Sequence, residues 1–205
     1  MGLFKKNQNH YEFQGNLSFG RQAFIFFWEI FKVVVISLAI IIPVRYFLIK
    51  PFYVKGASME PNFYDHEYLI IDEITYRFSE PQRGDVVVFR YPLETKQHFI
   101  KRVIGLPQEK IIISEGKIHI FSQENPKGQI LNEAYLLPAM KTFGDIEIEL
   151  DSDEYYLLGD NRTASLDSRA FGPVKKNNIV GRTLFRGWPL DRVGLVLFKL
   201  PYNLE

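Results

Sequence analysis

Three short stretches of this 205-residue chain combine residue types that could carry out a reaction. The first is GASMEP, at residues 56–61. A serine after two small residues can sit on a tight turn, with its hydroxyl exposed and backbone N–H groups close by. Such donors can hold a developing oxyanion, and Pro61 would fix the direction of the chain after the turn. Ser58 is therefore a candidate nucleophile, although most Gly-Ala-Ser turns are only turns.

The second stretch is FIKRVIGLP, at residues 99–107. If it forms a strand, Lys101 points the same way as Phe99 and Val103, while Arg102 points to the opposite face. Burial on an apolar face disfavours the ammonium form of a lysine and makes the side chain usable as a base. The alternative is a lysine that protects a sheet edge from aggregation. Lys101 is therefore a candidate general base.

The third stretch is GDNRTASLDSRAFG, at residues 159–172, which follows a hydrophobic run. Polar residues at this density mark either a loop ordered by side-chain hydrogen bonds or a functional site. Asp167 and Arg169 could pair, and Ser165 could orient a neighbouring amine. The alternative is a solvated loop.

Other combinations of residues are weaker. His98 lies three residues before Lys101, but the chain's four histidines are scattered, which favours surface or edge positions. Residues 151–153 resemble the start of a calcium loop, yet Tyr156 stands where that loop requires glycine. The absence of cysteine excludes thiol catalysis and Cys-ligated metal centres. We therefore expect neither a metal site nor a cofactor.

The element before the serine stretch is apolar. Residues 23–49 are long enough to cross a bilayer, which takes ~20 mostly apolar residues. Glu29 and Lys32 can pair on one helix face, which lowers the free-energy cost of placing their charges near the membrane–water interface. More than twenty residues precede this run, so we predict an uncleaved anchor rather than a removable signal peptide. A buried core helix is the alternative.

The rest of the chain has the pattern of a β protein. Short apolar runs separated by turn residues predict strands at 68–71, 86–89, 99–104, 146–150 and 155–158, and a hairpin over 111–121. We expect a mostly β fold of small antiparallel sheets or a partial barrel. A cap or insertion is expected around 111–150. The formal net charge of +1, without a long basic run, gives no reason to expect a nucleic-acid partner.

Taken in order, these blocks resemble the type I signal peptidases. The blocks are the anchor, RYFLIKPFYVKGASMEP (45–61), RGDVVVF (83–89), IKRVIGLP (100–107) and GDNRTASLDSRAFG (159–172). The resemblance covers most of residues 43–188 and is greatest to the compact, single-anchor Gram-positive type. It implies a membrane-bound serine endopeptidase that removes N-terminal signal peptides from exported precursors after a small-x-small motif.

The resemblance also implies roles for individual residues. Ser58 matches the nucleophile and supplies a backbone N–H to the oxyanion. Lys101 matches the general base, and Ser165 the serine that hydrogen-bonds this lysine. Asp167 and Arg169 match the pair that keeps the catalytic loop in shape. The candidate residues of the substrate pocket are Met59, Phe52, Val54, Phe99 and Ile100.

Two positions depart from the pattern of the family. Gly56 stands where some members carry a serine whose hydroxyl helps to bind the oxyanion. Gln108 stands where glycine usually follows the Leu-Pro pair, so the turn there is expected to differ.

The resemblance places three regions on the chain. Residues 1–22 would be a cytoplasmic tail, 23–49 the transmembrane anchor and 50–205 the extracytoplasmic catalytic domain at the plasma membrane. Charge alone does not orient the anchor, since basic residues flank both of its ends. The expected partners are signal-peptide-bearing preproteins, the lipid bilayer and the translocation machinery.

Two other interpretations remain open. One is a specialised Ser/Lys peptidase, such as a conjugation-type processing enzyme. A self-cleaving repressor would need a DNA-binding region, and residues 1–50 offer none. The other is a membrane-tethered β-domain that binds a partner without catalysis.

Overall fold

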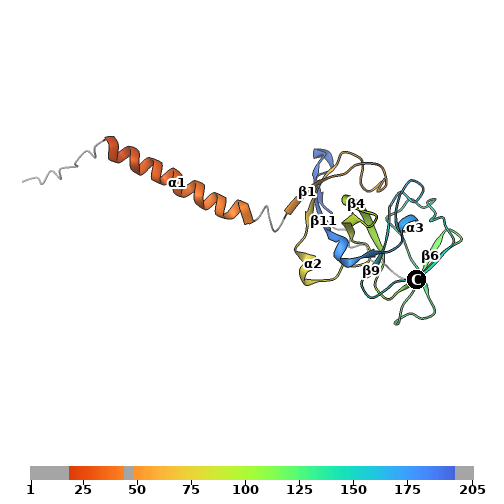
Figure 1. The fold of residues 1–205 in the computed structure, drawn as a ribbon. Helices are drawn as coiled ribbons and strands as arrows, with labels where there is room; N and C mark the ends of the chain where they lie inside the picture. Colours follow the sequence, from red (N-terminus) through yellow and green to blue (C-terminus); the bar gives the residue numbers. More distant parts are fainter. Residues whose placement is uncertain (1–18, 44–48, 197–205) are drawn as a thin grey trace, which may run out of the picture. The chain divides into compact units, whose positions relative to one another are not determined.

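The computed structural model describes residues 19–43 and 49–196, which belong to two compact units, 1–43 and 44–205. The first unit contains helix α1, Phe19–Pro43 (Figure 1). Its 25 residues span about 37 Å at 1.5 Å per residue. The mean hydropathy of an 18-residue window of this helix is 2.5, and no residue of that window is buried. Within the described residues it is the one helix long and apolar enough to cross a membrane.

The limits of α1 differ from the predicted anchor. The helix begins at Phe19, inside the region predicted as a tail, and its last described residue is Pro43. Proline has no backbone N–H and disfavours helical geometry in the residue before it, so Pro43 is a natural end for the helix. Ile49, the predicted last residue of the anchor, belongs to a strand instead. Residues 44–48, and the predicted tail up to residue 18, lie outside the described residues.

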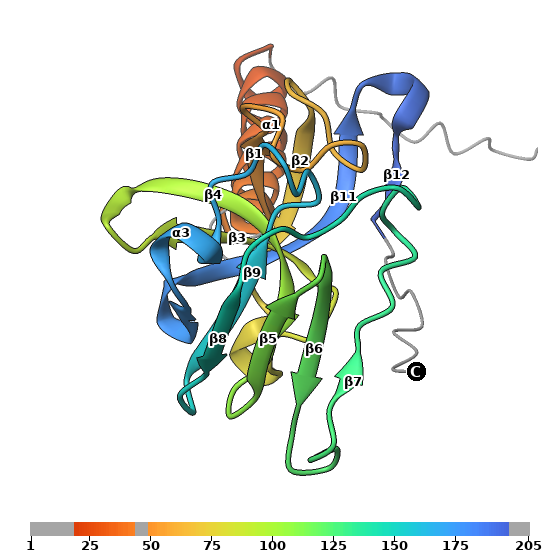
Figure 2. The same cartoon turned by 90° about the vertical axis from the view of Figure 1, so that its right-hand side faces the viewer.

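The second unit is built on two antiparallel sheets (Figure 2). The larger has eight strands, with the order β1-β2-β11-β3-β4-β9-β10, and β12 also pairs with β11. Its strands are β1 Ile49–Tyr53, β2 Tyr68–Asp72, β3 Val86–Tyr91, β4 Glu94–Gly105, β9 Glu154–Leu158, β10 Val174–Lys175, β11 Ile179–Trp188 and β12 Gly194–Leu195. Short helices lie between them: α2 Thr75–Phe78, α3 Ser168–Phe171, η2 Lys176–Asn178 and η3 Leu190–Arg192.

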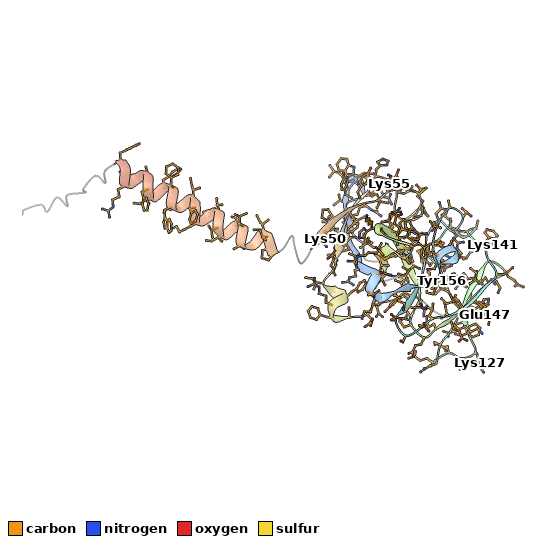
Figure 3. All side chains as sticks on the ribbon, viewed as in Figure 1. Lys50, Lys55, Lys127, Lys141, Glu147 and Tyr156 are labelled. Atoms are coloured by element: carbon orange, nitrogen blue, oxygen red, sulfur yellow. The ribbon has the colours of Figure 1, made fainter. Side chains whose placement is uncertain are left out.

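The smaller sheet corresponds to the region predicted as a cap or insertion. It has four strands in the order β7-β6-β5-β8. Their bounds are β5 Lys110–Ser114, β6 Lys117–Phe121, β7 Gln129–Ile130 and β8 Ile146–Glu149. Isoleucines of β5 and β6 pack on Ile104, Tyr156 and Leu158 of the larger sheet, so one core joins the two sheets. Tyr156 lies inside the domain, whereas Lys127 and Glu147 lie at its surface (Figure 3).

The mostly β fold is confirmed, and each predicted strand falls on an observed one. Strand β11 was not predicted, although it lies between β2 and β3 in the larger sheet. Its sequence, IVGRTLFRGW, lacks a clean alternation of polar and apolar residues. Gly181 is required there, because a Cβ would lie 2.5 Å from the carbonyl oxygen of Asp72. A glycine that is needed for close packing interrupts the hydrophobic pattern from which strands are predicted.

Two strand edges of the larger sheet are important for the site. Within the described residues, β1 pairs only with β2, and β4 meets β9 only from Arg102 onward. The outer edge of β1 and the first part of the outer edge of β4 are therefore unpaired. Four successive antiparallel pairings separate β1 from β4, so these two strands run in the same direction.

Candidate active site

Ser58 lies on a turn shortly after β1. Gly56 has φ 92°, in the left-handed region that glycine adopts at little cost. Its N–H donates to Asp65 Oδ1 at 2.8 Å. The turn is then closed by backbone bonds from Glu60 N to Ala57 O (3.2 Å) and from Phe63 N to Met59 O (2.9 Å). Ser58 is left half-buried at the rim of a cavity.

Lys101 reaches Ser58 from strand β4. Its Nζ donates to Ser58 Oγ at 2.8 Å and to the carbonyl oxygen of Ile100 at 2.8 Å. The lysine is 3% exposed, and its Nζ lies 5.5 Å from the centre of the Phe99 ring. The alternation of residues along the strand had predicted that Lys101 points to the same apolar face as Phe99. Two side chains 43 positions apart are thus in direct contact.

The protonation of Lys101 follows from its surroundings. Burial lowers the pKa of its amine from 10.5 to about 8, although the negative charges of Asp167 and Asp160 act in the opposite direction. Loss of hydration destabilises the ammonium ion, and the two carboxylates restore only part of its stability. A substantial fraction of the amine is therefore neutral slightly above neutral pH, and a neutral amine can accept the hydroxyl proton.

Asn161 fixes the carbonyl groups around the serine. Its N–H donates to Ser58 O at 3.1 Å, and its Nδ2 donates to Ala57 O at 3.1 Å. Among the described residues, the N–H of Ser58 itself donates to no protein group. That N–H could therefore donate to an oxyanion formed at the serine, and this role stays a prediction.

The loop that follows β9 carries the other predicted site residues. Arg169 holds Asp167 through Nε–Oδ1 (2.8 Å) and Nη2–Oδ2 (2.9 Å) bonds. Asp167 also accepts from the Gly159 N–H at 3.1 Å and from the N–H of Arg169 at the start of α3. Burial alone would raise the pKa of Asp167, but these bonds hold it below its usual range. The carboxylate is therefore ionised when the loop is folded.

Ser165 lies in the same loop without the hydrogen bond predicted for it. Its Oγ is buried near Asp167, whose pKa it helps to lower, but within the described residues no bond of normal geometry reaches it. A Cβ on Gly159 would lie 2.1 Å from Ser165 Oγ and 2.5 Å from the carbonyl oxygen of Ser58. The serine therefore packs beside the nucleophile turn, and a bond to Lys101 stays a prediction.

A buried ionic network that the sequence analysis missed connects these parts. Arg102 and Asp160, both fully buried, share two bonds, Nε–Oδ1 at 2.8 Å and Nη2–Oδ2 at 2.6 Å. Asn62 donates to the same carboxylate at 2.9 Å. The carboxylate thus ties the residue after Lys101 to the turn that begins at Ser58. Arg102, Asp160 and Asn62 lie far apart in the chain, so the sequence did not indicate that they meet. The one signal was that Arg102 directly follows Lys101.

A second part of the network reaches the segment between β7 and β8. Arg162 is buried and forms a two-bond ion pair with Glu133, with a Nη1–Oε2 distance of 2.7 Å. It also donates to the Tyr135 hydroxyl at 2.9 Å. The Tyr135 ring faces the guanidinium of Arg102 at 4.1 Å. No spacing in the sequence indicated these contacts.

A cavity of about 230 Å³ opens beside Ser58 and Lys101, between β1 and β4. Four of the five predicted pocket residues line it: Phe52, Val54, Phe99 and Ile100. The remaining lining residues are Tyr53, Lys55, Ser58, Leu69, Val88, His98, Lys101 and Leu166. The cavity is small and its lining is mostly apolar, which suits short apolar side chains.

The predictions for Met59 and Gln108 need correction. Met59 is 1% exposed and packs with Phe63 and Leu69 in the core, so it is not part of the cavity lining. Gln108 has φ 65°, in the region that favours glycine. The residue adopts the left-handed conformation itself, at a cost of roughly 1–2 kcal/mol. Met59 therefore supports the core rather than the cavity, and the turn at Gln108 keeps the left-handed conformation that glycine would adopt.

A serine activated by a buried lysine, beside an apolar cavity, is the arrangement of the Ser–Lys hydrolases. The family described as "Signal peptidase, peptidase S26" matches residues 27–188. Among curated proteins, "Probable signal peptidase I-2" of Synechocystis sp. is 36% identical, covering 82% of this chain and 76% of the relative. "Signal peptidase I" of Leptolyngbya laminosa is 36% identical (80% of each chain), and "Signal peptidase I P" of Bacillus subtilis subsp. natto is 33% identical (79% and 89%). The chain belongs to the signal peptidase family, peptidase S26.

Proposed function

We propose that this protein is a membrane-anchored signal peptidase in which Ser58 is the nucleophile and Lys101 the general base. The observation that carries the proposal is the 2.8 Å contact between Ser58 Oγ and the Nζ of a lysine that is 3% exposed. A lysine amine in water keeps its proton at neutral pH, but burial lowers the pKa of Lys101, so this amine can release its proton near neutral pH.

The reaction follows from this contact. Neutral Lys101 takes the Ser58 hydroxyl proton while Oγ bonds to the carbonyl carbon before the cut, and the Ser58 N–H stabilises the oxyanion. The C–N bond then breaks, and Lys101 gives its proton to the departing amine. Water next gives a proton to Lys101 and attacks the acyl-enzyme. The signal peptide leaves with a new carboxyl group, and Ser58 regains its proton.

The unpaired edges of β1 and β4 explain how a precursor would bind. Both strands run toward Ser58 and Lys101, and both contribute lining residues to the cavity. An extended peptide that runs toward the nucleophile can pair with either edge, a recognised form of peptide recognition. The small volume and apolar lining of the cavity favour substrates with short side chains at two positions. One is the residue directly before the cut, and the other is the residue two positions further upstream. These are the positions of the small-x-small motif.

The bilayer is the second partner in this proposal. Helix α1 would anchor the chain, and tethering would raise the effective concentration of enzyme at the membrane. Tyr53, Tyr68 and Trp188 lie side by side in register at one end of the larger sheet, each about half exposed. Aromatic residues of this kind favour the membrane–water interface. We place the domain on the extracytoplasmic side, where the translocation machinery delivers precursors.

Cleavage of a model precursor in detergent micelles tests the enzymatic proposal. We expect Ser58→Ala and Lys101→Ala to abolish cleavage while the far-ultraviolet circular dichroism is retained. Ser152→Ala and Lys117→Ala change exposed residues of the same types and should cleave at the wild-type rate. Unchanged cleavage by Ser58→Ala would exclude this serine as the nucleophile. A folded wild-type chain that binds precursors without cutting them would instead support a non-catalytic domain.

The membrane side requires a separate test. In spheroplasts, protease added outside should digest the β-domain while a cytoplasmic marker survives. Protection of the β-domain until the cells are lysed would reverse the proposed orientation.

A further inference from the structure

The turn that carries Ser58 is also held from β11 and η3, which take no part in the proposed reaction. The carbonyl oxygen of Asn62, near the end of this turn, accepts from Arg186 Nη2 at 2.6 Å and from Arg192 Nη2 at 3.2 Å. Hydrogen bonds from a charged donor are roughly twice as strong as bonds between neutral groups. Two residues that are distant in the sequence therefore hold one carbonyl group of the turn.

Both guanidinium groups pair with one buried carboxylate, that of Glu67. Arg192 Nη1 lies 2.7 Å from Glu67 Oε1, and Arg186 Nε lies 2.8 Å from Glu67 Oε2. Arg186 Cζ also lies 5.0 Å from the centre of the Phe63 ring. Arg192 Cζ lies 4.5 Å from the centre of the Tyr64 ring. Each guanidinium is thus held by a carboxylate, a carbonyl oxygen and an aromatic ring, which restricts its movement.

Asn62 connects these charged groups to the site in two ways. Its N–H donates at 3.1 Å to the carbonyl oxygen of the residue that follows the proposed nucleophile. Its Nδ2 donates at 2.9 Å to Asp160, which forms the buried ion pair with Arg102, the residue after Lys101. A displacement of Asn62 would therefore change the position of the serine relative to the lysine.

Arg192 bridges two parts of the chain through the two arms of its guanidinium. It lies on η3, in the segment that joins β11 to β12 (Figure 2). One arm pairs with Glu67, which directly precedes β2, and the other arm holds Asn62. If Arg192 were replaced, Glu67 would still pair with Arg186, so the fold would keep a partner for its buried carboxylate. The link between η3 and the turn would be lost.

We propose that Arg192 is a positioning residue for peptide cleavage, which keeps the Ser58 turn aligned with Lys101 by holding the carbonyl oxygen of Asn62. The inference rests on the proposed peptidase function. Neither Arg192 nor Asn62 belongs to the lining of the cavity beside Ser58. Loss of the arginine should therefore slow the chemical step and leave substrate binding nearly unchanged.

Cleavage kinetics of the full chain in detergent micelles test this role with two substitutions of Arg192. Arg192→Gln removes both the charge and the forked donor. Arg192→Lys keeps a positive charge beside Glu67 but lacks the planar fork that reaches two acceptors. Urea unfolding of each variant, measured under the same conditions, separates an effect on stability from an effect on kcat.

Arg182→Gln is the matched control. Arg182 lies on β11, and its side chain is 37% exposed, compared with 30% for Arg192. Its ion pair with Asp72 has an Nε–Oδ2 distance of 3.1 Å, and its Nη2 donates to Thr75, so these contacts lie outside the Ser58 turn. Loss of a similarly exposed ion pair is thus compared at a position that does not hold the nucleophile.

We expect Arg192→Gln to lower kcat about ten-fold and to change KM less than about two-fold, because a small misplacement of a reacting group slows the reaction more than it weakens binding. Arg192→Lys should unfold at the wild-type urea concentration, with kcat still at least about three-fold below the wild-type value. Arg182→Gln should lower the urea midpoint about as much as Arg192→Gln does and leave kcat unchanged.

Three outcomes would overturn the proposal. The first is wild-type kcat in folded Arg192→Gln, and the second is an equal loss of kcat in Arg182→Gln, which would indicate a general effect of stability. The third is wild-type kcat in Arg192→Lys, which decides the question even if Arg192→Gln does not fold. Failure of the peptidase function would appear differently, as absence of precursor cleavage by the wild-type protein.

Discussion

Replacing Lys101 by methionine should stabilise the protein at neutral pH while it abolishes cleavage. Burial lowers the pKa of Lys101 from 10.5 to about 8, so at pH 7 the fold must hold a charge that it disfavours. At ~1.4 kcal/mol per tenfold change in protonation, this cost is about 3 kcal/mol. Methionine removes the charge but loses hydrogen bonds to Ser58 and Ile100, each worth about 1 kcal/mol. We expect a net gain of about 1 kcal/mol.

The sign of this effect should reverse at high pH. The unfolded lysine keeps its proton up to pH 10.5, whereas the folded lysine loses it at about 8. Between these values the folded state binds fewer protons, so the stability of the wild-type protein rises with pH. By pH 10 most of the charge cost has disappeared from the wild type. The methionine variant should then be less stable by roughly 1–2 kcal/mol, because only the lost hydrogen bonds remain.

Urea unfolding of the full chain in mild detergent, followed by near-ultraviolet circular dichroism, measures both values. Lys117→Met alters an exposed lysine and should leave the free energy of unfolding within about 0.5 kcal/mol of the wild-type value at both pH values. Equal destabilisation by Lys101→Met at pH 7 and pH 10 would refute the reasoning, because it would mean that folding does not disfavour the charge.

Three further predictions concern activity and stability. The kcat/KM of the wild type should rise about ten-fold between pH 7 and pH 9, because the neutral fraction of Lys101 rises by that factor; a rate that does not change over this range would contradict the assigned base. Asp160→Asn should lower the free energy of unfolding by about 3–5 kcal/mol in urea titrations, because it leaves Arg102 buried without its counter-charge; a loss below 1 kcal/mol would argue against the ion pair. Gly159→Ala should lower kcat by about 10²-fold, because the new Cβ would displace the Ser58 carbonyl; wild-type kcat would show that the turn tolerates the shift.

Local rules made Ser58 and Lys101 separate candidates in the sequence. Alternation along β4 placed Lys101 on an apolar face, and two small residues before Ser58 indicated an exposed turn. The contact between them could not be read from these rules, since it depends on how β1, β2, β11 and β3 bring β4 to the serine. Only the resemblance to a family linked the two residues in advance.

Long-range polar contacts were beyond prediction for the same reason. Asp160 meets Arg102 across 58 positions and Asn62 across 98. Nothing in the local pattern around Asp160 distinguishes a buried ion pair from a solvated loop. Met59 was misplaced because its position next to Ser58 says nothing about direction, and its side chain enters the core instead of the cavity.

Nuclear magnetic resonance of the lysine side chains tests the central claim most directly. The full chain, labelled with ¹³C at the lysine ε-carbons and held in detergent micelles, gives a titration curve for each lysine. The Lys101 resonance is the one that disappears in Lys101→Met. We predict a midpoint of about 8 for this resonance. A Lys101 midpoint above 10 would show an amine that keeps its proton, and Lys101 could not then be the base that activates Ser58.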